Sequence, residues 1–195
     1  MNGLTLNRLE KDAIDFDVFD SYVYKKSYFE ILSFFQEARI LQESHLIIYA
    51  QIIYGSMPTM VNINLKNKDK LLTILSKARD GGEVNLEEIK IIKEYINNSL
   101  VGASKLLHFL NPKTYAIWDS RIHRYITGKP TSYGINNIST YIKYLESVKD
   151  ISSMDDYSRL HQKIAKHFDY EIQPSRVMEI IMFQTDRNNK GWNKF

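Results

Sequence analysis

Cysteine is absent from the 195 residues. Without cysteine the protein has no disulfide, no thiolate nucleophile and no zinc or iron–sulfur site with cysteine ligands. The five histidines are scattered, and none stands in an HExxH or similar arrangement. We therefore predict no metal site and no cofactor, and we expect His108 and His123 to be structural.

Long apolar runs are missing as well. No run approaches the roughly 20 residues that a helix needs to cross a bilayer, so we expect no membrane partner. The N-terminal residues, MNGLTLNRLEKD, lack the basic-then-apolar pattern of a signal peptide, which favours a cytoplasmic protein. Since 44% of the residues are hydrophobic, residues 1–195 are enough for one sizeable core, and we expect a single domain that is a monomer.

Charge is unevenly distributed, although the net charge is only +3. Residues 1–100 carry 12 basic and 14 acidic side chains, and residues 101–195 carry 14 and 9. The second half is thus the electropositive one. Such a surface attracts polyanions, nucleic acid above all, but an excess of this size is also common on ordinary soluble proteins.

The spacing of apolar residues predicts an all-α fold with about eight or nine helices. The run LIIYAQIIY at 46–54 fits a buried helix or a buried strand, and VNINLK at 61–66 alternates like a strand that has no partner. The other helices are predicted at 18–41, 69–79, 86–97, 101–110, from Asp119 to Ile126, 138–149, 154–168 and 174–185. Asn85, Asp119 and a Ser153–Asp156 pair stand where helix caps belong, and Pro174 fits a first turn.

The helices group into three parts along the chain. Residues 1–98 form an N-terminal helical layer, 99–126 a helical hairpin with its Asp segment, and 137–185 the C-terminal helices. The segment TGKPTSYGIN at 127–136 is the clearest loop, and residues 186–195 form a polar tail.

Asp119 is the only acidic residue between residues 100 and 135. Five cations share that stretch: Lys105, Lys113, Arg121, Arg124 and Lys129. A carboxylate among cations, at the start of a helix, is expected to have a lowered pKa and to stay ionised. Such a group suits the stabilisation of an oxocarbenium-like transition state at a sugar C1′, but a helix N-cap alone explains an aspartate here equally simply.

The segment ASKLLHFLNPKTYAIWDSRIHRYI, residues 103–126, resembles the catalytic segment of the helix-hairpin-helix DNA glycosylases. It is most similar to the 8-oxoguanine and endonuclease III-type members, in which a helix and a short turn lead to an Asp that opens a second helix. The resemblance implies a helix-hairpin-helix fold that accepts a base flipped out of double-stranded DNA. It also implies that Asp119 both caps its helix and serves the chemistry.

Two departures from the family pattern change the expected reaction. The family hairpin usually reads L-P-G-V-G, whereas NNSLVGAS supplies only Gly102, so the hairpin is degenerate. The lysine of lyase-competent members lies 18 residues before the Asp, and that position is Val101. Using Lys105 instead requires a four-residue shift. We therefore expect a glycosylase without lyase activity.

Other residues complete the expected site. The residues expected to contact DNA are Gly102, Ser104, Lys105, Arg121 and Arg124. A base pocket is expected to use Tyr22, Tyr28 and Trp118, although aromatic residues in such helices more often belong to the core.

The expected activity is hydrolysis of the N-glycosidic bond of a damaged or modified base. Two alternatives stay open. One is a transferase that hypermodifies DNA bases on the same fold. The other is a non-catalytic helical module that binds nucleic acid or protein, in which Asp119 only caps a helix.

Overall fold

The computed structural model describes residues 3–189 except 15, 17–21, 56 and 58–59, and it does not describe the side chains of residues 22–25. The described part is all-α, as the sequence predicts, and contains ten helices with one isolated bridge between Ile63 and Ile96. The helices are α1 (Leu6–Asp12), α2 (Tyr22–Glu37), α3 (Glu43–Tyr54), α4 (Lys68–Arg79), α5 (Leu86–Tyr95), α6 (Leu100–Leu110), α7 (Ser120–Thr127), α8 (Ile138–Ser152), α9 (Tyr157–Ala165) and α10 (Pro174–Asn188). None of these helices is both long and apolar enough to span a bilayer.

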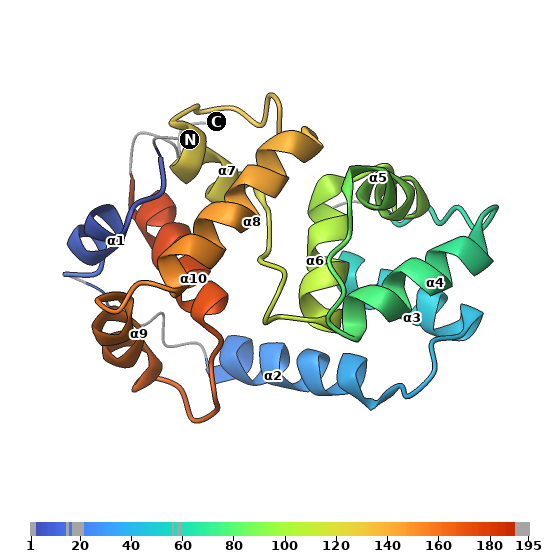
Figure 1. Cartoon of the computed structure of the whole chain (residues 1–195), viewed down its shortest axis with the longest axis horizontal. Helices are drawn as coiled ribbons and strands as arrows, with labels where there is room; N and C mark the ends of the chain where they lie inside the picture. Colours follow the sequence, from blue (N-terminus) through green and yellow to red (C-terminus); the bar gives the residue numbers. More distant parts are fainter. Residues whose placement is uncertain (1–2, 15, 17–21, 56, 58–59, 190–195) are drawn as a thin grey trace.

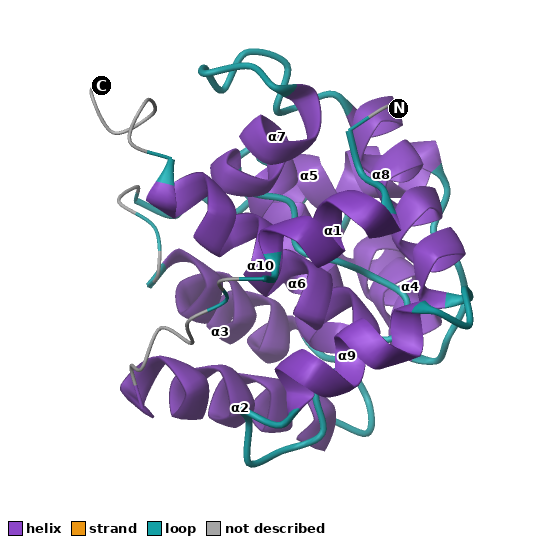
Figure 2. Ribbon diagram, turned by 90° about the vertical axis from the view of Figure 1, so that its left-hand side faces the viewer, coloured by secondary structure: helices purple, strands orange, loops and turns teal. Residues whose placement is uncertain are grey.

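The helices pack around two hydrophobic clusters. One cluster joins α1 to α7–α10 and also includes Ile89 of α5 and Leu100 of α6, and the other joins α2–α6. Figure 1 shows the two groups side by side, with α2 running beneath both. Figure 2 shows α2 at the opposite end of the molecule from α7, with α3 next to it. The rings of Phe35 in α2 and Tyr49 in α3 stack 3.8 Å apart, which fixes these two helices together.

Helix α1 is absent from the sequence prediction, and it does not join the N-terminal layer expected over residues 1–98. It packs instead against α10. Leu9 is fully buried in the cluster of C-terminal helices, and Asp12 accepts a hydrogen bond from the Tyr125 hydroxyl at 2.7 Å. The guanidinium of Arg8 lies 3.7 Å from the centre of the Tyr125 ring. The start of the described chain therefore belongs to the C-terminal core.

Several local predictions can be compared directly with the helix ends. Asn85 caps α5 in a reciprocal pair with Glu88, and Pro174 stands in the first turn of α10, as expected. The expected Ser153–Asp156 capping pair is wrong, because Ser153 ends α8 and the Asp156 side chain makes no cap hydrogen bond. Residues 46–54 lie in α3, and 61–66 form no strand beyond the isolated bridge.

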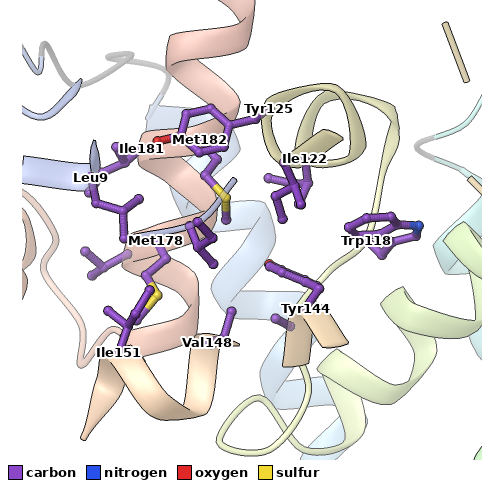
Figure 3. Close-up of a cluster of buried hydrophobic side chains, with 14 of the residues drawn as sticks. Leu9, Trp118, Ile122, Tyr125, Tyr144, Val148, Ile151, Met178, Ile181 and Met182 are labelled. Carbon is purple, nitrogen blue, oxygen red and sulfur yellow. The ribbon is translucent and has the colours of Figure 1, made fainter. Parts of the chain in front are cut away.

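Trp118 belongs to the core. Its side chain is fully buried, its ring centre lies 5.3 Å from that of Tyr144, and its indole N–H donates to the carbonyl of Ile135 at 2.8 Å. Figure 3 shows the indole beside Tyr144 in the cluster built on α8 and α10. The expectation that Trp118 lines a base pocket is therefore corrected: its partners are core side chains.

Two buried tyrosines of α8 offer a matched test of this packing. The Tyr141 hydroxyl donates to the carbonyl of Ala116 at 3.1 Å, whereas the Tyr144 hydroxyl has no hydrogen-bond partner in the described part of the chain. Tyr141→Phe should therefore lower the free energy of unfolding by about 1 kcal/mol, and Tyr144→Phe should leave it unchanged or raise it. Urea denaturation of both variants checks this. Equal losses would contradict the arrangement.

Candidate active site

A buried segment without helix or strand, residues 115–118, lies between α6 and α7 and leads directly to Asp119. Two side chains one turn apart on α6 bind its backbone. The Ser104 hydroxyl accepts the N–H of Trp118 at 2.9 Å, and its oxygen lies 3.1 Å from the carbonyl oxygen of Trp118 and 2.9 Å from that of Val101. Nδ1 of His108 lies 2.8 Å from the carbonyl oxygen of Tyr115. Ser104, which we expect from the sequence to contact DNA, is instead fully buried and anchors this segment.

Helix α10 binds the same segment from the other side. The Glu179 carboxylate accepts the N–H of Ile117 through Oε1 and a hydrogen bond from Arg176 through Oε2, the latter at 2.8 Å. Both charged side chains are buried, with exposed fractions of 2% for Glu179 and 8% for Arg176. A buried carboxylate needs such donors, because an uncompensated charge in the interior is costly. Glu179 thereby fixes the backbone two residues before Asp119.

Asp119 is the N-cap of α7, as predicted. Its Oδ1 accepts the backbone N–H groups of Arg121 at 2.8 Å and Ile122 at 2.9 Å. These two bonds use one carboxylate oxygen and hold the side chain in one orientation. The cap and the candidate catalytic group are thus the same residue, and one role does not exclude the other.

Asp119 lies on the wall of a cavity of about 540 Å³, here called the central cavity. Its walls come from α2, α3 and α6 of one cluster and from α7 and α10 of the other. Aromatic lining residues are Tyr28, Phe109, Phe168 and Phe183, and charged ones besides Asp119 are Lys105, Arg121, Arg176, Glu179 and Arg187. Its volume falls within the range of small-molecule sites, about 300–1,000 Å³. The wall is therefore mostly apolar and carries six charged side chains.

Lys105 lines the central cavity together with Asp119. Burial lowers the pKa of the Lys105 ammonium, the negative charge of Asp119 opposes this, and the positive charge of Arg176 adds to it. Lys105 follows Ser104 on α6, so of two adjacent residues one binds the 115–118 segment and the other lines the central cavity. A surface contact with DNA is therefore only one of the roles open to Lys105.

The two arginines after Asp119 have a partner that the sequence pattern does not reveal. Arg124 contacts both carboxylate oxygens of the buried Asp186, at 2.9 and 2.6 Å, and Arg121 lies 3.3 Å from the same group. Asp119 is thus not the one acid among these cations, because Asp186 and Glu179 reach this region from α10. Arg121 also lines the central cavity, whereas Arg124 does not.

Side-chain oxygens accept the first N–H groups of α6 at the hairpin between α5 and α6. Ser99 accepts the N–H of Gly102 at 3.1 Å, and the side-chain oxygen of Asn136 accepts that of Leu100 at 3.0 Å. A side chain at Gly102 would meet the Ile96 side chain at 3.3 Å, so close packing explains this glycine. The sequence pattern predicts that Gly102 contacts DNA, but its N–H already has an internal acceptor.

The expected aromatic residues separate in the structure. Tyr28 lines the central cavity, whereas Trp118 lies in the core. The side chain of Tyr22 is outside the described residues. Among those residues, no three His, Asp or Glu side chains are grouped so as to hold a metal ion.

Glu179, Arg176 and Phe183 are site residues that the sequence reasoning missed. One signal was present: Arg176 and Glu179 stand three residues apart on the same face of a helix, and the other residues from 177 to 183 are all apolar. Charged residues at such positions are rarely buried unless they are paired.

No protein-family model, curated protein or solved structure matches this chain.

The pKa values of two buried histidines determine how the stability of the fold should depend on pH. Burial lowers the pKa of His108 and of His123, so below about pH 6.5 the unfolded chain binds protons that the folded protein does not. The free energy of unfolding should therefore fall as pH drops from about 6.5 to 5, by up to about 1.4 kcal/mol per pH unit for each histidine. Urea denaturation across this range measures the slope. His123→Gln should reduce it, and a flat wild-type profile would contradict the prediction.

Proposed function

We propose that the protein is a DNA glycosylase that hydrolyses the N-glycosidic bond of a damaged or modified base held in the central cavity. One observation carries the proposal. A carboxylate fixed by two backbone N–H groups, that of Asp119, lies on the wall of a largely apolar cavity large enough for a base. The resemblance of residues 103–126 to the glycosylase segment supports the same reading.

The fixed carboxylate acts on the sugar. As the base leaves, positive charge develops at C1′, and a negative charge already held nearby lowers the energy of that state without reorganising. The two cap hydrogen bonds keep the Asp119 carboxylate in place before the substrate arrives. Water then attacks the sugar, and the product is an abasic site in an intact strand.

The cations of the cavity support binding of the DNA backbone. Arg121 on α7 and Arg187 on α10 line the same cavity as Asp119. Flipping a base costs a few kcal/mol, least for a damaged or weakly paired base, and contacts between cations and phosphates offset that cost.

Lys105 supports a second candidate, a glycosylase that is also a lyase. It shares the central cavity with Asp119, and its lowered pKa increases the fraction of neutral amine available to attack C1′. The negative charge of Asp119 works against this, because it favours the ammonium form. We retain hydrolysis by water as the main proposal.

Replacing Asp119 tests the proposal. Asp119→Asn should lower the rate of base release at least about 100-fold, because the amide carries no charge to oppose the sugar cation. Its stability should stay within about 0.5 kcal/mol of the wild type, since Asn caps helices as well as Asp. Free base is measured by mass spectrometry after incubation with duplexes that carry different lesions and natural modifications.

A matched control is available at the start of α9. Asp156 is also an N-cap aspartate, but it is exposed and its side chain makes no cap hydrogen bond. Asp156→Asn should release base at the wild-type rate. Full activity of Asp119→Asn would leave Asp119 as a cap only and would favour a different function.

Borohydride distinguishes the two glycosylase mechanisms. Reduction during turnover converts an imine between the protein and the sugar into a stable covalent adduct, whereas hydrolysis by water leaves none. We expect no adduct with the wild type. An adduct that persists in Lys113→Ala, an exposed lysine outside the cavity, and is lost in Lys105→Ala would establish the lyase instead.

A further inference from the structure

The carboxylate of Asp186 on α10 binds two arginines of α7 at once. Its Oδ1 accepts a hydrogen bond from Nε of Arg124 at 2.9 Å. Its Oδ2 accepts one from Nη2 of Arg124 at 2.6 Å and one from Nη1 of Arg121 at 3.3 Å. The Asp186 side chain is almost fully buried. Two guanidinium groups thus share one buried carboxylate, and the three side chains together carry an excess of one positive charge.

The two arginines are bound to Asp186 in different ways. Arg124 places two N–H groups on the carboxylate, its side chain is 17% exposed, and it does not line the central cavity. Arg121 places one N–H group there, its side chain is 31% exposed, and it lines the cavity. A guanidinium has five N–H donors. Within the described part of the chain the other four donors of Arg121 have no acceptor, so they are available to a ligand.

An aromatic ring supports the Arg121 guanidinium on a second side. Its central carbon lies 4.9 Å from the ring centre of Phe183, which also lines the cavity. The backbone N–H of Arg121 donates to Oδ1 of Asp119 at 2.8 Å. The residue that holds the candidate catalytic carboxylate through its backbone therefore also places a cation at the same cavity, and Asp186 and Phe183 fix the position of that cation.

We propose that Arg121 forms a phosphate subsite of the central cavity and that Asp186 is the positioning residue that holds its guanidinium in place. The ligand is one of the two phosphodiester groups that flank the nucleotide in the cavity, because a planar guanidinium can bind two phosphate oxygens at once. The inference rests on the proposed function for its ligand, a DNA strand. It goes beyond that function by assigning one phosphate to one arginine and a role to a carboxylate that does not touch DNA.

The charge of Asp186 gives this role a distinctive consequence. If the carboxylate acted only through its charge, it would repel the phosphate, and Asp186→Asn would strengthen DNA binding. If it acts by holding the guanidinium, Asp186→Asn weakens binding although it removes a negative charge, because a neutral amide forms no ion pair with Arg121. The direction of the change therefore separates positioning from charge.

The test uses duplexes in which a tetrahydrofuran replaces the sugar and base of one nucleotide. In two further duplexes a neutral methylphosphonate replaces the phosphate on the 5′ side or on the 3′ side of the tetrahydrofuran. The wild type should bind the unmodified duplex about 10-fold more tightly than one of the two methylphosphonate duplexes, which corresponds to one hydrogen-bonded charge. This ratio of affinities is here called the phosphate preference.

Two variants should lose the phosphate preference. Asp186→Asn should reduce it to within about twofold of unity and should also weaken binding of the unmodified duplex. Partial unfolding cannot produce the first effect, because it lowers both affinities by the same factor. Arg121→Lys keeps the charge but cannot bind a phosphate bidentately, so it should lose the preference as well. It leaves the pair between Asp186 and Arg124 in place and decides the question if Asp186→Asn does not fold.

Asp155→Asn is the matched control. It makes the same substitution at an exposed aspartate outside the cavity, and it should keep the wild-type phosphate preference.

The outcomes separate this inference from the proposed function. The inference would be overturned by failure of the wild type to bind the tetrahydrofuran duplex or by equal affinities for all three duplexes. A phosphate preference that survives Asp186→Asn or Arg121→Lys, or stronger binding by Asp186→Asn, would also overturn it. Absence of base release from every duplex would overturn the glycosylase proposal alone, because binding of a duplex that already lacks the base needs no catalysis.

Discussion

The buried backbone of residues 115–118, which forms no helix or strand, holds together the helices around it. A backbone that leaves a helix inside the protein needs other hydrogen-bond partners, because an unsatisfied polar group in the interior is costly. Ser104, His108, Tyr141 and Glu179 supply partners from three helices. Each of those helices is thereby fixed relative to the segment, and hence to Asp119.

The same backbone also places Asp119 between the two hydrophobic clusters. The segment passes from α6 of one cluster to α7 of the other, so Asp119 emerges where their walls face each other across the central cavity. The polar groups behind the wall then have two functions. They satisfy the backbone, and Glu179 and His108 also contact Arg176 and Tyr28, which line the cavity.

The sequence predicted what depends on neighbouring residues. The apolar spacing of α8 and α10, the cap at Asn85 and the cap at Asp119 are local signals, and the structure confirms them. Helix α1 escaped prediction because it has only seven residues and buries only Leu9.

The partners of the site were not predictable in the same way. Asp186 lies 62 positions from Arg124 and Glu179 lies 62 from Ile117, so only the fold brings them together. The same applies to Tyr28 and Trp118, because composition alone does not show which aromatic ring faces the cavity.

The proposal that Asp119 opposes a cation on the sugar can be tested without knowing the base. A duplex with a pyrrolidine in place of one sugar carries a positive charge near C1′, and its tetrahydrofuran counterpart is neutral. The wild type should bind the charged duplex at least about 100-fold more tightly, as for a transition-state analogue, and Asp119→Asn should bind the two equally. Equal affinities for the two duplexes in the wild-type protein would contradict the account.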